Sequence, residues 1–176
     1  MPVPEGPPTI GRQLYRRDRE QKNKPRPGRT PEPTLTMKAY LTRRYFFSAS
    51  HRLHSDAMSP EENRTTYGKC NNPHGHGHNY CLEVTVSGQI DACTGMVCNL
   101  VDLDGFVERE VLSHYDLENL NTLQEFAKSV PSTENLCVEI FEILQRGFHH
   151  AHLERVRIEE TMMNSFEYSG AAVLQK

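Results

Sequence analysis

Apolar and polar positions alternate along two segments in the first half of the chain. From Met37 to about Ser48, aromatic and β-branched residues are frequent, which is typical of a strand. Over residues 80–87, Tyr, Leu and two Val alternate with Cys, Glu, Thr and Ser. This period of two indicates a half-buried strand. Two further strands are expected, a short one around Met96–Cys98 and a longer one over Leu153–Thr161.

A helical period appears in two later segments. The first helix is expected to begin after Asp102 as N-cap and to run to about Val111. The second is capped by Ser132 or Thr133, and apolar residues then recur at i, i+3, i+4 and i+7. A helical turn is also expected over residues 59–63. The order of these elements predicts an α+β fold with antiparallel pairing, because it has too few βαβ units for a Rossmann sheet.

Charge divides the chain of 176 residues into two parts. Residues 1–36 hold eight of the eleven prolines, with eight basic and four acidic residues, so this segment is +4 and the remainder is −7. We interpret 1–36 as a disordered Pro/Arg-rich tail or an over-extended start, and 37–176 as one folded domain. A basic arm is the usual reason to expect nucleic acid, but the acidic body does not support that partner.

Composition excludes several other classes of protein. There is no apolar run of the ~18–20 residues that a membrane-spanning helix needs, and the N-terminus lacks the apolar core of a signal peptide. Five cysteines without a Cys-x-x-Cys pair fit neither a disulfide framework nor a zinc ribbon. We therefore expect a cytoplasmic protein with free thiols and no membrane partner.

A histidine run opens the second long strand, in the sequence His74-Gly75-His76-Gly77-His78. Residues two apart in a strand share a face, so His76 and His78 aim their imidazoles at one point. Catalytic zinc takes three protein ligands and keeps one open position, and either His51 or His54 could supply the third. The later run of three histidines over residues 149–152 follows a helix end and is interpreted as solvated.

Cys70 lies just ahead of this run in a loop rich in Gly and Asn. A free cysteine is usually a small buried apolar residue, but this loop offers no apolar pocket. A nearby zinc ion and Lys69 would favour the thiolate, the form that acts as a base or nucleophile. The other four cysteines, at positions 81, 93, 98 and 137, are interpreted as small buried apolar residues.

Glu160 shares the inward face of the last predicted strand with Val156 and Ile158. A carboxylate on that face costs several kcal/mol unless it is paired. One carboxylate accepts two parallel N–H bonds from an amino-pyrimidinone ring, which makes Glu160 a candidate ligand anchor. The alternative is that Thr161 begins a turn and the glutamate reaches solvent.

These features together resemble the 6-pyruvoyltetrahydropterin synthase / 6-carboxytetrahydropterin synthase family, over roughly Met37–Gly170. The matching stretches, in chain order, are Phe47-Ser48-Ala49-Ser50-His51-Arg52-Leu53, Gly68-Lys69-Cys70-Asn71-Asn72, Gly75-His76-Gly77-His78-Asn79-Tyr80, Thr94-Gly95-Met96-Val97, Ser132-Thr133-Glu134-Asn135 and Glu160-Thr161.

The resemblance implies the tunnelling fold, a four-stranded antiparallel sheet with two helices on one face. In this fold the sheets of several subunits close into an oligomeric β-barrel, and members are typically homohexamers with active sites at subunit interfaces. The resemblance also implies zinc bound by His51, His76 and His78, which leaves out His54 and His74.

By the same resemblance, Cys70 abstracts a proton, Asp116 takes part in catalysis, and Glu160 binds the pterin ring with Ser132 and Thr133 beside it. The implied substrate is 7,8-dihydroneopterin triphosphate. Our first hypothesis is a zinc-dependent lyase that forms 6-carboxy-5,6,7,8-tetrahydropterin with loss of acetaldehyde and triphosphate, in queuosine (7-deazapurine) synthesis.

Two alternatives remain open. One is 6-pyruvoyltetrahydropterin synthase, which only eliminates triphosphate, in tetrahydrobiopterin synthesis. The other is a catalytically weakened pterin-binding zinc protein, because the family's proton-relay histidine is replaced by Leu117. General acid–base catalysis typically increases the reaction rate by ~10²–10⁴, and a leucine side chain cannot accept or donate a proton. His114, His74 and His54 are candidates to replace it.

Overall fold

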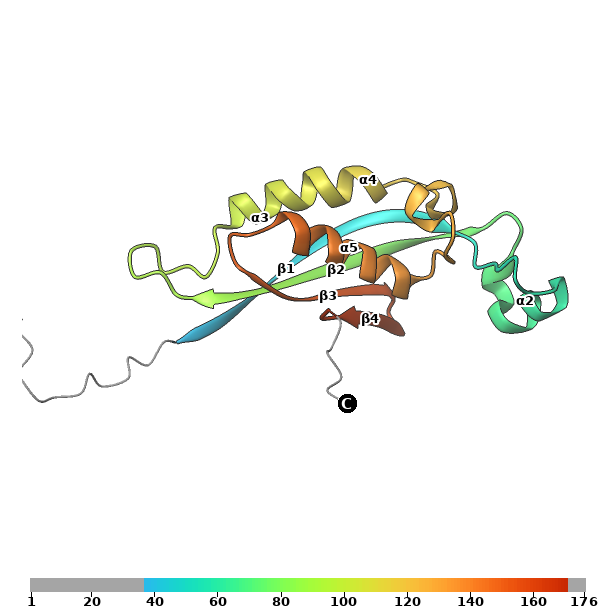
Figure 1. Ribbon diagram of the computed structural model, residues 1–176, viewed down its shortest axis with the longest axis horizontal. Coiled ribbons are helices and arrows are strands. Elements are labelled where there is room, and N and C mark those ends of the chain that lie inside the picture. The colour runs from blue at the N-terminus through green and yellow to red at the C-terminus, as the bar shows by residue number, and fades with distance from the viewer. Residues whose placement is uncertain (1–36, 171–176) are drawn as a thin grey trace, which may run out of the picture. The chain divides into compact units, whose positions relative to one another are not determined.

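The computed structural model describes residues 37–170, so the interpretation of residues 1–36 lies outside the described part of the chain. Four strands form one antiparallel sheet in the order β1-β2-β3-β4 (Figure 1). They are β1 (Lys38–His51), β2 (His76–Gln89), β3 (His152–Thr161) and β4 (Asn164–Tyr168).

Because side chains alternate along each strand, apolar residues of neighbouring strands lie side by side on one face of the sheet. Tyr45 of β1 pairs with Leu82 of β2, which pairs with Ile158 of β3, and all three side chains are buried. Helix α5 (Thr133–Gly147) turns Leu136, Ile140, Phe141 and Leu144 toward this face, all of them buried. Burial of such side chains is the main stabilising contribution to the fold.

The helices α3 (Leu100–Val107), α4 (Ser113–Tyr115) and α5 cover this one face of the sheet (Figure 1). A single π-helical turn, Glu108–Leu112, joins α3 to α4. Helix α2 (Pro60–Tyr67) lies beyond the end of the sheet, in the connection from β1 to β2 (Figure 1). The architecture confirms the expected α+β class and the tunnelling fold within one chain.

Three details of the predicted elements are wrong. Residues 96–98 form no strand, and residues 97 and 98 are bends, because a three-residue apolar run has no period that separates a strand from a loop. The fourth strand is instead β4, which pairs with β3 through a short turn. The N-cap of α3 is Asn99, whose side chain accepts a hydrogen bond from Val101 N, so the helix begins earlier than Asp102.

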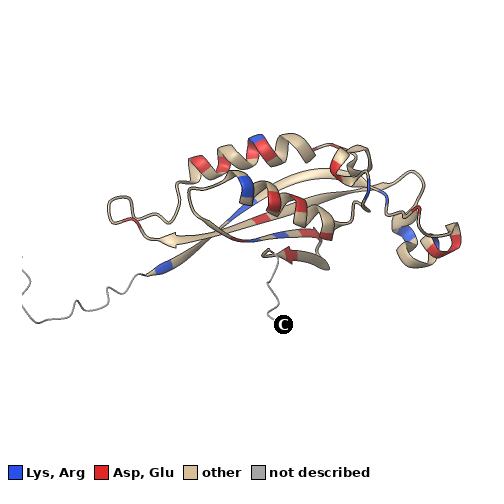
Figure 2. Cartoon of the chain, in the orientation of Figure 1, with Lys and Arg blue, Asp and Glu red and all other residues tan. Residues whose placement is uncertain are grey.

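Acidic residues outnumber basic ones along these helices, with Asp102 and Asp104 in α3 and three glutamates against Arg146 in α5 (Figure 2). Within residues 37–170, none of the helices combines the length and apolar character needed to cross a bilayer. The positions that carry chemistry lie together where β1 ends and β2 begins, which is also where α5 starts.

Candidate metal and catalytic site

Three histidines meet where β1 ends and β2 begins. His51 pairs with His76 across the two strands, and His78 follows two residues later on the same face. One ligand-type atom from each residue lies within 4.8 Å of the other two. The Nε2 atoms of His51 and His76 are 3.2 Å apart. Two nitrogens on one tetrahedral zinc, each at about 2.05 Å from it, are separated by about 3.3 Å.

Hydrogen bonding and burial prepare these rings to bind a metal. The His51 Nδ1 atom is 2.8 Å from the Pro131 carbonyl oxygen, to which it donates its proton, so Nε2 is left as the lone-pair nitrogen. Burial lowers the pKa of both His51 and His76, which favours the neutral, ligating form. His76 Nδ1 and His78 Nε2 are buried, and no hydrogen-bond partner for them exists among the described residues. Three imidazoles gathered in this way fit a zinc ion.

Glu160 lies beside the three rings at the end of β3. Its Oε1 atom is 3.7 Å from His51 Nε2 and 3.6 Å from His78 Nε2. The same oxygen accepts a hydrogen bond from the Thr133 hydroxyl at 2.5 Å, and Oε2 accepts one from Asn164 Nδ2 at 2.7 Å. Burial alone would raise the pKa of Glu160, but these hydrogen bonds and the nearby imidazoles bring it below its usual value. The site therefore holds Glu160 as a carboxylate with lone pairs left for a ligand.

Cys70 lies in a 3₁₀ turn, Gly68–Asn71, that is fastened to the chain beyond β1. The Cys70 carbonyl accepts a hydrogen bond from Leu53 N at 2.9 Å, and Asn71 Nδ2 donates to the Leu53 carbonyl at 2.7 Å. Burial, and then the negative charge of Glu160, raise the pKa of the Cys70 thiol. The protein groups by themselves therefore favour the thiol, and the charge of a metal ion bound nearby would favour the thiolate.

The start of α5 closes the site from the helix side. Ser132 is the N-cap of this helix, and its hydroxyl accepts a hydrogen bond from Asn135 N. Thr133 is the residue of this pair that reaches Glu160 directly. Of the two positions expected to bind substrate, Thr133 therefore belongs to the site, whereas the Ser132 side chain stabilises the helix end.

Tyr80 is a site residue that sequence reasoning did not single out. It continues the alternation of His76 and His78, so its ring lies on the same face, with its centroid 5.5 Å from that of His78. Its hydroxyl is buried and lacks a hydrogen-bond partner within residues 37–170. The period of two that placed the histidines together was the available signal.

Asp116 and Leu117 are hydrogen-bonded to β1 at Ser48. The Asp116 carboxylate accepts a hydrogen bond from Ser48 N at 2.8 Å, and Leu117 N donates to the Ser48 carbonyl at 2.6 Å. Leu117 has a φ of 63° and a side chain that is 83% exposed. With His78 it lines a cavity of about 290 Å³ on the β1 side. The proposed relay position therefore adjoins a metal-site residue, and a catalytic role for Asp116 stays a prediction.

The remaining histidines lie outside the cluster. His54 Nδ1 accepts hydrogen bonds from Asn71 Nδ2 at 3.1 Å and from Arg52 Nη2 at 3.3 Å, so this ring serves the loop. His74 is exposed, as are the two histidines at positions 149 and 150 and the one at position 152. His114 is exposed and its Nε2 atom is 2.6 Å from Glu125 Oε1, on the helix side.

Three imidazoles that could hold a metal ion lie at one end of the antiparallel sheet, together with a thiol and a carboxylate that could serve as acid–base groups. Comparison with known proteins identifies the family. The sequence profile described as "6-pyruvoyl tetrahydropterin synthase" matches residues 40–171. The chain belongs to this family of zinc-dependent pterin lyases.

Individual relatives agree with the family assignment. The 6-pyruvoyl tetrahydrobiopterin synthase of Poecilia reticulata is 48% identical over 132 residues, which are 74% of this chain and 90% of that protein. The Homo sapiens protein of the same name is 47% identical over 133 residues, which are 75% and 92% of the two chains. The structure of Caenorhabditis elegans 6-pyruvoyl tetrahydropterin synthase superposes with a TM-score of 0.74 at 39% identity, over 77% of this chain and 98% of that one.

Proposed function

We propose that this protein converts 7,8-dihydroneopterin triphosphate to 6-pyruvoyltetrahydropterin, with elimination of triphosphate. The observation that carries this proposal is the convergence of His51, His76 and His78 beside Cys70 and Glu160 at one sheet end. The relatives described above are named for the pyruvoyl reaction and are up to 48% identical. They support this alternative better than the 6-carboxy reaction that was our first hypothesis.

Each side chain has a distinct task in this proposal. Glu160, held as a carboxylate by Thr133, accepts N–H bonds from the pterin ring and so orients the side chain of the substrate toward the histidines. A zinc ion bound by the three histidines would act as a Lewis acid, acidifying a hydroxyl group and polarising a carbonyl. Cys70 then moves a proton on the substrate side chain. The buried Tyr80 hydroxyl supplies a further hydrogen-bonding group to the same space.

The products of a single reaction test the proposal. Purified, zinc-loaded protein incubated with 7,8-dihydroneopterin triphosphate is expected to release triphosphate and to form the pyruvoyl pterin without acetaldehyde. Acetaldehyde released in step with turnover would contradict the pyruvoyl branch and establish the 6-carboxy reaction. Chromatography of the pterins together with an enzymatic assay for acetaldehyde makes the distinction.

The substitution Glu160→Gln tests the anchor. An amide offers one oxygen and no negative charge, so pterin binding is expected to weaken about 10- to 100-fold, the range for a hydrogen bond to a charged group. Fluorescence titration with 7,8-dihydroneopterin measures the change. Glu159→Gln is the matched control, because Glu159 is on the opposite face of β3, 3.6 Å from Arg157, and should leave the affinity unchanged. Equal affinity for Glu160→Gln and the unaltered protein would remove the anchor role.

We also propose a homo-oligomer, a homohexamer if the resemblance extends to assembly. β1 and β4 are the two edges of an open sheet in one chain. Large apolar side chains on β1 are exposed, with Tyr40 at 63% and Phe46 at 73%. Such side chains are typical of surfaces that become buried between subunits.

A further inference from the structure

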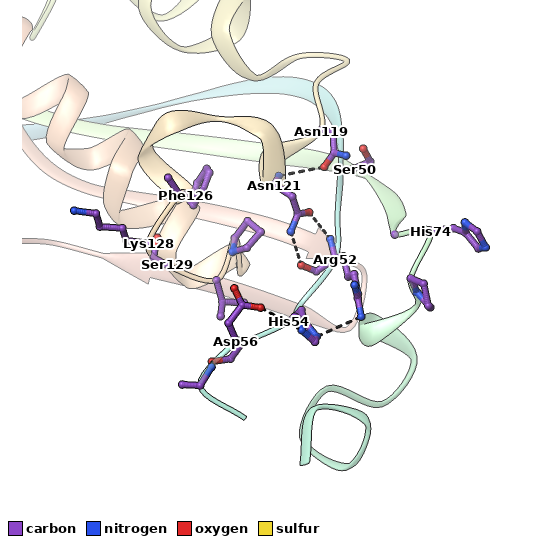
Figure 3. A pocket seen from close by; sticks show the side chains of 17 residues that line it. Ser50, Arg52, His54, Asp56, His74, Asn119, Asn121, Phe126, Lys128 and Ser129 are labelled. Atoms are coloured by element: carbon purple, nitrogen blue, oxygen red, sulfur yellow. Dashed lines mark hydrogen bonds and ion pairs between the residues drawn. The ribbon is translucent and has the colours of Figure 1, made fainter. Parts of the chain in front are cut away.

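Arg52 directly follows His51 in the chain. Both its backbone N–H and its backbone carbonyl form hydrogen bonds. Arg52 N donates to Asn121 Oδ1 at 2.7 Å, and Asn121 Nδ2 donates to the Arg52 carbonyl at 2.8 Å. The guanidinium donates from Nε to the Asn71 carbonyl at 3.2 Å and from Nη2 to His54 Nδ1 at 3.3 Å. Figure 3 shows the side chain directed toward His54. A long cationic side chain is therefore fixed beside the turn that carries Cys70.

This guanidinium has no carboxylate partner in the described part of the chain. Arg43 forms a two-point ion pair with Asp104, with bonds of 2.9 and 2.8 Å, and Arg44 pairs with Glu83 at 2.6 Å. For Arg52, and likewise for Lys69, no Asp or Glu oxygen among residues 37–170 lies within the 4.0 Å of an ion pair. Arg52 is half-buried, and a partly buried cation without a counter-ion is stabilised by any anion that reaches it.

Arg52 lines two cavities, and they differ in charge. The cavity against the Gly68–Asn71 turn has a volume of about 570 Å³, and its wall includes Arg52, Lys69 and Arg64 but no Asp or Glu, although Arg64 forms an ion pair with Glu61 outside the wall. The cavity in Figure 3, of about 530 Å³, has Lys128 in its wall but also Asp56, which faces His54 at 3.5 Å. In Figure 2 the segments that carry the basic residues of the first cavity lie where β1 leaves the sheet and at α2. The first cavity is therefore the one built for an anion.

We propose that this cavity binds a polyphosphate group, with Arg52 and Lys69 as its principal contacts. A guanidinium fork matches two phosphate oxygens, and the ammonium group of a lysine adds a point charge on the same ligand. Lys69 precedes Cys70 directly, so the anion would lie against the turn that carries Cys70. The inference rests on the proposed function to the extent that the substrate of that reaction carries a triphosphate tail. Inorganic polyphosphate presents the same chemistry without the pterin.

Calorimetric titration with inorganic tripolyphosphate tests the site directly, in excess Mg²⁺ so that the probe does not strip zinc. The zinc-loaded protein is expected to bind the probe, and Arg52→Gln and Lys69→Gln are each expected to raise Kd at least about tenfold, as loss of a charge-assisted bond does. Lys128→Gln is the matched control, because it removes one positive charge from the other cavity and should change Kd less than about twofold. Metal analysis and thermal unfolding verify that each variant is folded and loaded.

Two results would overturn the inference. One is the absence of tripolyphosphate binding at millimolar concentration in the unaltered protein. The other is a Kd that responds equally to Lys69→Gln and Lys128→Gln, or to neither Arg52→Gln nor Lys69→Gln.

A second arm separates this inference from the proposed function. The affinities for 7,8-dihydroneopterin triphosphate and for 7,8-dihydroneopterin are compared in the same proteins. If the preference for the triphosphate form falls about tenfold in Arg52→Gln, the occupant is the tail of the substrate. Tripolyphosphate binding that depends on Arg52, in a protein without turnover, would refute the proposed function and leave the polyphosphate site standing. If the protein turns over the substrate, and neither KM nor the tripolyphosphate affinity changes in Arg52→Gln, the polyphosphate site would be refuted and the proposed function would stand.

Discussion

Replacement of Cys70 by alanine is expected to lower the rate of triphosphate release by at least about 10²–10⁴, the usual contribution of a positioned acid–base group. Pterin affinity and zinc content should stay unchanged, because the groups that hold them are Glu160 and the three histidines. The Cys70 side chain is not what fixes the turn, since its backbone carbonyl and Asn71 make the bonds to Leu53. Single-turnover measurement of phosphate products, alongside metal analysis, gives both quantities from one preparation.

Cys93→Ala provides the matched control for this experiment. Contrary to the expectation of a buried residue, Cys93 is an exposed thiol in the connection between β2 and α3, so its loss should leave the rate unchanged. Equal rates for Cys70→Ala and the unaltered protein would remove Cys70 from the mechanism. No release by the unaltered, zinc-loaded protein would instead support a pterin-binding protein weakened by Leu117.

The histidine site was predictable to a large extent from spacing alone. A strand places residues two apart on one face, and this brings His76 and His78 together without knowledge of the fold. The choice between His51 and His54 required more than periodicity. β1 continues to His51, which stays in register with His76, whereas His54 lies beyond the strand end and turns toward Asn71. The resemblance to a known family selected His51, and the structure gives the physical reason.

Features that depend on contacts distant in the sequence were not predictable in the same way. β4 is five residues long, and it becomes a strand because Phe166 pairs with Ile158 across the sheet. The Tyr80 hydroxyl has no hydrogen-bond partner within residues 37–170, and this can be seen only when its neighbours in the fold are known. Arg52 looked like any basic residue in the sequence. The structure shows that Arg43 and Arg44 pair with Asp104 and Glu83, whereas Arg52 has no carboxylate partner within residues 37–170.

The histidines of a single run provide the sharpest test of the metal centre. His76→Ala and His78→Ala should each reduce bound zinc from about one per chain to a small fraction of that, because a zinc site with two protein ligands binds far more weakly than one with three. His74→Ala should leave the zinc content unchanged, since His74 is exposed and outside the cluster although it belongs to the same alternating sequence. Plasma emission spectrometry of dialysed protein measures the metal.

Stability should change together with the metal, because a ligand that binds only the folded protein stabilises it. Removal of zinc by a chelator is therefore expected to lower the Tm of the unaltered protein and of His74→Ala, and added zinc should restore both Tm and activity. The Tm of His76→Ala should respond to neither treatment, since that variant has no site to empty or fill. If His74→Ala lost zinc as completely as His76→Ala, the ligand set would be wrong. Full activity in a metal-free protein would show that the three histidines do not act as ligands of a catalytic metal.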